Sequence, residues 1–245
     1  MPRFKIRTIT FSVDTITTAG VLVNNASSLN PTDVVATEGW IKPQDRTSCI
    51  FFDNSNSGVT NSYFLSIDGA TGRISWFSTI GGIAKNLTNL AGIKPGIWNF
   101  VSAWYDGSNV VVSANGAQLG TVAATGTLGT NPGQLRIGQY WNMGVPSFCR
   151  ITLPRIYNRT YTLTDHRSRF YDALDNSTMR TSLVLDMPTT EGSGSTVADV
   201  SGFSNNGAFS RAVWSSDTPF KDRNATSGRG ATSGRGSASS RVLIT

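Results

Sequence analysis

Residues 98–120 read WNFVSAWYDGSNVVVSANGAQLG, and their pattern is the clearest sign of the architecture. Two apolar runs of strand length are separated by Asp106-Gly107, and Asn115-Gly116 follows the second run. Asp, Asn and Gly tolerate the positive φ angles of tight hairpin turns. The stretch therefore predicts consecutive antiparallel strands joined by short turns.

The same pattern recurs along most of the chain. Alternating apolar residues from Phe4 to Val13 indicate an early strand, and SLVLDM (182–187) indicates a late one. Further short apolar runs between Gly, Asn and Asp clusters are GWIKP (39–43), SCIFF (48–52), YFLSI (63–67), RISWFS (73–78) and QLRIG (134–138). Many short strands separated by turns predict an all-β sandwich or barrel.

One segment, TDHRSRFYDAL (164–174), departs from the strand pattern. Thr164 is a residue type that caps helix N-termini, so we expect a short helix to begin there. The spacing of Phe170, Tyr171 and Leu174 predicts that these three side chains share the buried face of the helix.

Four motifs in this order resemble the laminin-G-like branch of the concanavalin A-like lectin/glucanase superfamily. They are GWIKP, the 98–120 stretch, LRIG (135–138) and RIYNRTYTLTDHRSRFYD (155–172). The resemblance covers roughly residues 1–214. It implies a two-sheet antiparallel jelly roll, which we expect to occupy residues 1–216, with the helix after the IYNR strand. The LVLDM to NNGAF segment (183–209) resembles a family element and implies a strand that returns to pair near the N-terminus.

Beyond residue 216 we expect an extended arm, residues 217–245. Its sequence ATSGRG occurs twice in succession (225–236), and residues 221–245 carry five basic residues against one acidic residue. We predict that the arm contacts neighbouring protein subunits, its apolar tip adding as a strand to a sheet edge. The residues assigned to this role are Arg229, Arg235, Arg241, Val242, Leu243 and Ile244. A disordered linker is the alternative, and the few arginines without interleaved aromatic residues argue against nucleic acid.

Residues suited to catalysis are scarce, so we expect no enzymatic activity and no cofactor. The only glutamates, Glu38 and Glu191, lie in apparent turns and form no Glu-x-Asp-x-x-Glu motif, which glycosidases of the resembled superfamily carry. The only histidine, His166, falls in the first helical turn, where a solvated or capping role is expected. We expect Cys49 and Cys149 to be buried thiols, with a single disulfide as the alternative.

Calcium is the alternative to the absence of a metal. Two groups of oxygen-bearing side chains are candidate ligands: Asp53, Asn54 and Asn56, and Asp199, Asn205 and Asn206. Such residues also form turns that satisfy their own backbone. The strand before IYNR reads RITLPR (150–155), where the resembled branch commonly carries acidic residues, and this weakens the calcium hypothesis.

A glycan site is predicted at Tyr140, Trp141 and Asn142, in a loop between strands. An exposed aromatic ring there could stack on a sugar while Asn142 supplies a hydrogen bond. Alternatively, Trp141 plugs the end of the sandwich.

No apolar run is long enough for a membrane-spanning helix, and the first residues lack the apolar core of a signal peptide. We therefore predict a non-enzymatic structural surface protein of a large assembly. We expect it in a virus or phage virion, as a decoration, cement or tail-associated protein whose loops could bind a cell-surface glycan. The alternative is an extracellular lectin module, secreted or displayed.

Overall fold

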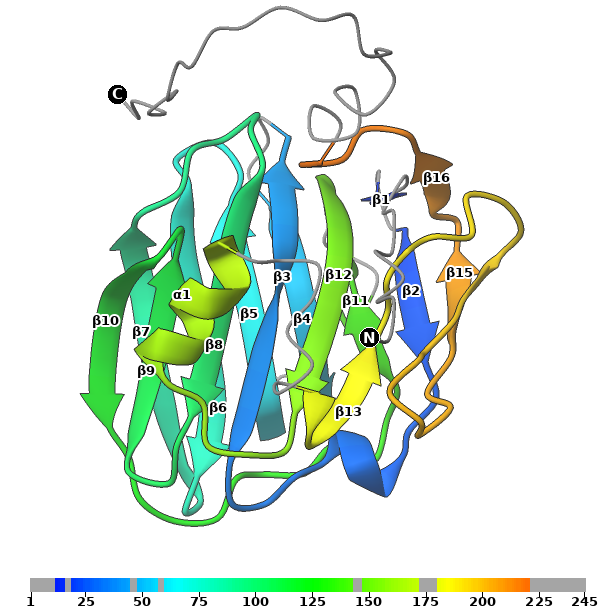
Figure 1. Ribbon diagram of the computed structural model, residues 1–245. Helices are drawn as coiled ribbons and strands as arrows, with labels where there is room; N and C mark the ends of the chain where they lie inside the picture. The colour runs from blue at the N-terminus through cyan, green and yellow to red at the C-terminus, as the bar shows by residue number, and fades with distance from the viewer. Residues whose placement is uncertain are drawn as a thin grey trace, which may run out of the picture.

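The computed structural model describes residues 12–15, 19–44, 48–56, 60–142, 147–171 and 180–220. These described residues fold as two eight-stranded antiparallel sheets packed face to face, and helix α1 lies against the outside of one of them (Figure 1). This is the all-β, two-sheet antiparallel jelly roll with a short helix that the sequence predicts. The N-terminal part of the predicted first strand and the predicted arm from residue 221 onward lie outside the described residues.

Sheet A has the strand order β10-β9-β8-β3-β12-β1-β16, and β13 pairs with the C-terminal end of β12. Its strands are β1 (Ser12–Thr15), β3 (Val35–Pro43), β8 (Asn99–Tyr105), β9 (Asn109–Ala114), β10 (Ala117–Ala123), β12 (Cys149–Tyr157), β13 (Leu183–Asp186) and β16 (Val213–Ser215).

Sheet B has the order β14-β15-β2-β11-β4-β5-β6-β7. Its strands are β2 (Gly20–Val23), β4 (Cys49–Asn56), β5 (Thr60–Asp68), β6 (Arg73–Ile80), β7 (Ile83–Ala91), β11 (Leu135–Ile137), β14 (Thr196–Val197) and β15 (Gly207–Ser210). The 3-10 helix η1 (Ser27–Leu29) and α1 (Leu163–Tyr171) lie outside the sheets.

The core lies between the sheets. Successive side chains of a strand point to opposite faces, so each strand contributes every second residue to the interior. Ile41 and Val101 enter it from sheet A, and Phe51 and Trp76 enter it from sheet B, all of them fully buried or nearly so. Burial of such a side chain stabilises the fold by about 1.5–3 kcal/mol. The other face of each sheet is called its outer face below.

The predicted hairpins of residues 98–120 are confirmed. Asp106 closes the β8-β9 turn by accepting hydrogen bonds from the backbone N–H groups of Ser108 and Asn109. Asn115 and Gly116 have φ angles of 50° and 86°, as the turn between β9 and β10 requires. The predicted return to the N-terminal region is also confirmed, because β15 pairs with β2.

Helix α1 differs from the prediction in its cap and in its buried face. It begins at Leu163, and its cap is Thr162, whose Oγ1 accepts the Asp165 N–H while Asp165 accepts the Thr162 N–H. The buried residues of α1 are His166 and Arg169, whereas Tyr171 is 68 % exposed. The predicted face made of Phe170, Tyr171 and Leu174 is therefore wrong for Tyr171, and Leu174 lies outside the described residues.

The last described residues, up to Phe220, pack on the outer face of sheet A. Asp217 accepts hydrogen bonds from Lys42, Arg150 and the Trp98 indole N–H, at 2.8, 2.6 and 3.2 Å. Burial opposes ionisation of Asp217, but these three donors lower its pKa to about 2. Phe220 is buried as well. The chain thus leaves the described part on the sheet A side.

Candidate functional site

A row of side chains crosses the outer face of sheet B. Strand register places Arg136 beside Asp53, Asp53 beside Phe64, Phe64 beside Phe77, and Phe77 beside Asn86. Partners in antiparallel register point to the same face, so these five side chains line up across five strands. Arg136 and Phe77 are half-buried, and Asn86 is exposed.

The predicted glycan residues lie on this row. The Tyr140 ring packs edge-on against Phe64, with 5.6 Å between ring centroids, and Trp141 contacts Tyr140 at 6.0 Å. Both rings are half-buried, and Asn142 is exposed. The loop after β11 therefore lies over the outer face of sheet B, and it presents two aromatic rings there.

Asp53 holds this loop in place. Its Oδ2 atom accepts the backbone N–H of Trp141 at 2.7 Å, and its Oδ1 accepts the N–H and the hydroxyl of Ser55 at 3.0 and 2.5 Å. The carboxyl group is fully buried. Burial raises the pKa of Asp53, and the hydrogen bonds from Ser55 and Trp141 and the charge of Arg136 partly oppose the shift. A buried carboxylate that accepts three hydrogen bonds fixes the start of the loop.

The first calcium hypothesis grouped Asp53, Asn54 and Asn56, and these residues lie in strand β4. Asp53 faces outward, whereas Asn54 points into the protein and donates to the Leu29 carbonyl at 3.0 Å. Adjacent residues of a strand point to opposite faces, so Asp53 and Asn54 do not converge.

In the second calcium hypothesis, Asp199, Asn205 and Asn206 form a hydrogen-bonded turn. Asp199 accepts the backbone N–H groups of Asp186 and Asn205, and Asn206 accepts the Asp199 N–H. Among the described residues, no three His, Cys, Asp or Glu side chains gather as a metal site would require. Calcium binding stays a prediction.

The outer face of sheet A carries a second row, and this one is polar. Register places Ser113 beside Ser102, Ser102 beside Glu38, Glu38 beside Arg155, and Arg155 beside Asp186. A bulge in β12 between residues 152 and 155 turns Arg155 to the outer face, next to Glu38.

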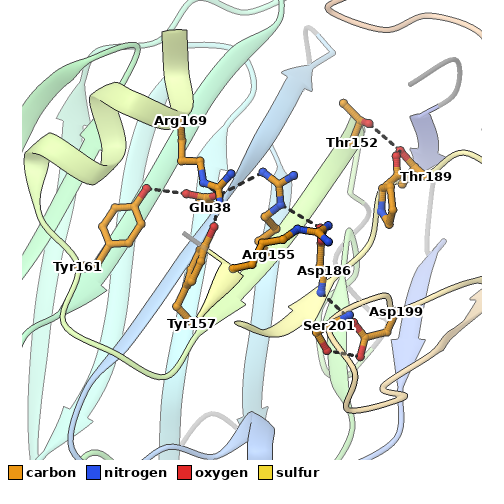
Figure 2. A network of polar contacts seen from close by, with 12 residues as sticks. Glu38, Thr152, Arg155, Tyr157, Tyr161, Arg169, Asp186, Thr189, Asp199 and Ser201 are labelled. Atoms are coloured by element: carbon orange, nitrogen blue, oxygen red, sulfur yellow. Dashed lines mark hydrogen bonds and ion pairs between the residues drawn. The ribbon is translucent and has the colours of Figure 1, made fainter. Parts of the chain in front are cut away.

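Glu38 is fully buried in a network of charges and phenols (Figure 2). It accepts the hydroxyls of Tyr157 and Tyr161 at 2.7 and 2.5 Å, and its Oε1 lies 3.3 Å from Arg155 and 3.6 Å from Arg169. The expected turn at Glu38 is therefore wrong, because the residue lies within β3. Burial raises the pKa of both tyrosines, so they remain protonated donors.

Asp186 extends the network at the other side of Arg155. Arg155 Nε donates to Asp186 at 2.9 Å, and Arg180 lies 3.1 Å from its second oxygen. The nearby carboxylates raise the pKa of Arg155 although burial opposes this. The charges of Glu38, Arg155 and Asp186 thus compensate one another within the network.

His166 is buried, so the expected solvated or capping role is wrong. Its Nε2 accepts the Gly116 N–H at 2.9 Å, and its Nδ1 lies 2.6 Å from the Ser102 hydroxyl. Burial, and then the charge of Arg167, lower its pKa to about 4. His166 therefore stays neutral near pH 7 and joins α1 to the polar row and to the turn between β9 and β10.

The remaining candidates lie apart from both rows. Cys49 and Cys149 are buried free thiols, as expected. Arg229, Arg235, Arg241, Val242, Leu243 and Ile244 lie outside the described residues, so the assembly arm stays a prediction. Within the described part of the chain, no helix has the length and apolar character needed to cross a membrane.

Comparison with protein families matches residues 15–165 to the family described as the concanavalin A-like lectin/glucanases superfamily. A search of curated proteins finds no match. Among solved structures, a protein from Bacteroides ovatus provisionally described as carbohydrate-binding is similar with a TM-score of 0.63 and 15 % identity, over 85 % of this chain and 60 % of that one. The native heptameric SAP-like pentraxin of Limulus polyphemus is similar with a TM-score of 0.51 and 14 % identity, over 68 % and 84 %. These structures share the fold.

Proposed function

The chain belongs to the concanavalin A-like lectin/glucanase superfamily, and from this premise we propose that it is a non-enzymatic carbohydrate-binding module. The proposed binding surface is the outer face of sheet B around Tyr140, Trp141 and Asn142. The observation that carries the proposal is the hydrogen bond from the Trp141 N–H to the buried carboxyl group of Asp53, which fixes two half-exposed aromatic rings on that face. Aromatic rings beside a few polar groups suit the mixed apolar and hydroxylated surface of a sugar.

The polar groups near these rings come from the loop itself and from the row of side chains beneath it. Asn142 and Asn86 are exposed, and Arg136 is half-buried, so amide and guanidinium groups border the aromatic rings. The similarity to the Bacteroides ovatus protein supports carbohydrate as the ligand class. This chain spans 60 % of the length of that protein. The proposal of a carbohydrate ligand therefore rests mainly on the residues of this chain.

Both glutamates support a role without catalysis. Glycoside hydrolysis needs two carboxyl groups on either side of the scissile bond. Glu38 is sealed beneath α1, and Glu191 accepts the backbone N–H of Ala198 at 2.8 Å in a loop. Neither belongs to the outer face of sheet B.

The assembly hypothesis addresses the opposite side of the molecule. Asp217 and Phe220 bind the chain to the outer face of sheet A, so the last described residue lies on the side opposite the proposed glycan surface. An arm anchored in a virion or another surface would leave sheet B facing outward, and we propose an extracellular or surface-displayed location. Light scattering of the full chain beside a chain ending at Phe220 tests this: the arm requires that only the full chain assembles, and equal masses contradict it.

A glycan array tests the proposed function, followed by titration of the best ligand into two variants. Trp141→Ala removes a ring from the sheet B face, and we expect binding to weaken about tenfold or more. Trp98→Ala, a half-buried indole on the sheet A side, is the matched control and should bind like the parent. Thermal melts establish that both variants are folded. Full binding by Trp141→Ala, or no ligand on the array, would contradict the proposal.

A further inference from the structure

The two cysteines of the chain meet in the core, although they lie far apart in the sequence. Cys49 begins β4 in sheet B, and Cys149 begins β12 in sheet A. Both are fully buried in the same apolar core, and the neighbouring Cys149 thiol contributes to the raised pKa of Cys49. The two thiols thus face one another from opposite sheets.

The surrounding backbone holds both residues in register. The Phe148 N–H donates to the Ser48 carbonyl, and the Ile50 N–H donates to the Ser147 hydroxyl, both at 2.9 Å. These two bonds tie the residues on either side of Cys49 to the residues just before Cys149. The thiols are therefore positioned by the fold, with little freedom to separate.

The contacts of Cys149 also show where its sulfur lies. Its Sγ is 3.2 Å from the Thr15 hydroxyl and 3.7 Å from the carbonyl oxygen of Ile50. Ile50 directly follows Cys49 in the chain. We infer that Cys49 and Cys149 are a cross-sheet dithiol that closes to a disulfide when the chain folds in the presence of a small disulfide oxidant. Such a bond would join sheet A to sheet B covalently.

The reaction balances with a disulfide such as oxidised glutathione. One cysteine thiolate attacks a glutathione sulfur, forms a mixed disulfide and releases one glutathione thiolate. The second cysteine then attacks the protein sulfur of that mixed disulfide, and the second glutathione leaves. Two protein thiols lose two protons and two electrons, and one oxidised glutathione becomes two reduced molecules.

The folded protein protects its thiols from this reaction. Neither sulfur is accessible, and burial, followed by the contact with Cys149, raises the pKa of Cys49 well above its ordinary value. Because the thiolate is the reactive form, exchange is slow in the native state. Closure is therefore expected during folding, while the thiols are still accessible, and its occurrence would depend on the redox poise of the compartment in which the chain folds.

The test refolds the full chain in a glutathione redox buffer and, in parallel, under reducing conditions. The folded monomer is isolated and then denatured with a thiol-alkylating reagent before mass spectrometry. The chain has only two cysteines, so any intramolecular disulfide must join Cys49 to Cys149. We expect the oxidised monomer to lose the mass of two hydrogens and to take up no alkyl group. We also expect it to melt about 5–15 °C above the reduced monomer, since the bond closes a long loop.

Cys149→Ser is the control, because it keeps a small polar side chain at the hydrogen-bonded position and removes the partner of Cys49. Its folded form should melt at the same temperature after either treatment. Two alkylated thiols in the wild-type oxidised monomer, or disulfides found only between chains, would overturn the inference.

Discussion

The two outer faces of the sandwich are built on the same plan and have opposite character. Each carries a row of side chains in register across five strands. On sheet A the row is polar and covered, because His166 and Arg169 of α1 bind to it. On sheet B the row holds Phe64, Phe77 and Asp53, and a loop with two half-buried rings lies over it. From this difference we propose that the sheet A face contributes stability and that the sheet B face contacts the ligand.

The polar row explains why α1 docks through its own polar side. A short helix usually covers a sheet with apolar residues. Here Glu38 lies beneath the helix, and an uncompensated buried carboxylate would cost several kcal/mol. Arg169 and the two tyrosines supply the compensating charge and donors. The buried groups of this face therefore depend on one another. Removing one of them leaves its partners buried without a compensating charge or hydrogen bond.

The largest effect is expected at the centre of the sheet A network. Arg155→Ala leaves Glu38 and Asp186 without their shared partner, and we expect a loss of about 3–5 kcal/mol in the free energy of unfolding, measured with denaturant. Arg180→Ala removes a more exposed partner of the same Asp186, and its cost should be at most about 1 kcal/mol. Equal losses in the two variants would show that the buried network does not hold this face.

His166 gives sheet A a dependence on pH. In the unfolded chain its pKa is near 6.5, whereas in the folded protein it is about 4. Between these values the unfolded chain binds a proton that the folded chain does not, so the free energy of unfolding falls as the pH is lowered through this range. We expect a loss of up to about 3 kcal/mol.

His166 is the only histidine, so we expect it to give most of the slope between pH 6.5 and about 5. Unfolding curves of the wild type and His166→Gln across this range measure the effect. The variant should be less stable at pH 7 but nearly flat with pH. A slope unchanged by the substitution would contradict the buried, neutral state of His166.

A smaller loss of stability is expected on sheet B. Asp53→Asn replaces one accepting oxygen with an N–H donor, so one of the bonds to Trp141 and Ser55 must be lost. We expect a cost of about 1–2 kcal/mol and weaker glycan binding, because the loop is released. Asp68→Asn, at an exposed turn where one oxygen accepts two backbone N–H groups, is the matched control with little expected change. If Asp53→Asn bound the glycan as well as the wild type, Asp53 would not be needed to hold the binding loop.

Local patterns were sufficient for much of the fold. Asp106-Gly107 and Asn115-Gly116 predicted their turns, because the conformation of a tight turn depends on the residues within it. Strand β7 was not predicted, since it is an edge strand whose polar and exposed residues show no hydrophobic alternation. The buried face of α1 was predicted only in part. Phe170 packs against Trp40 and Phe100, but the burial of Arg169 depends on Glu38, more than a hundred residues earlier in the chain.

Only part of the candidate site could be predicted from the sequence. Tyr140 and Trp141 were identifiable as aromatic residues in a loop. The role of Asp53 was not, because it follows from the register between β11, β4 and β5 and from a bond to a backbone 88 residues away. Arg155 was hidden for a similar reason: a bulge turns it outward against the simple alternation of β12.

Hydrogen exchange with and without the best glycan from the array tests the division between the two faces most directly. We expect the ligand to slow exchange in residues 136–142 and in strands β5 and β6, and to leave α1, β3 and β12 unchanged. Slower exchange in α1, β3 or β12, with residues 136–142 unaffected, would contradict the account and would place the ligand on the sheet A face.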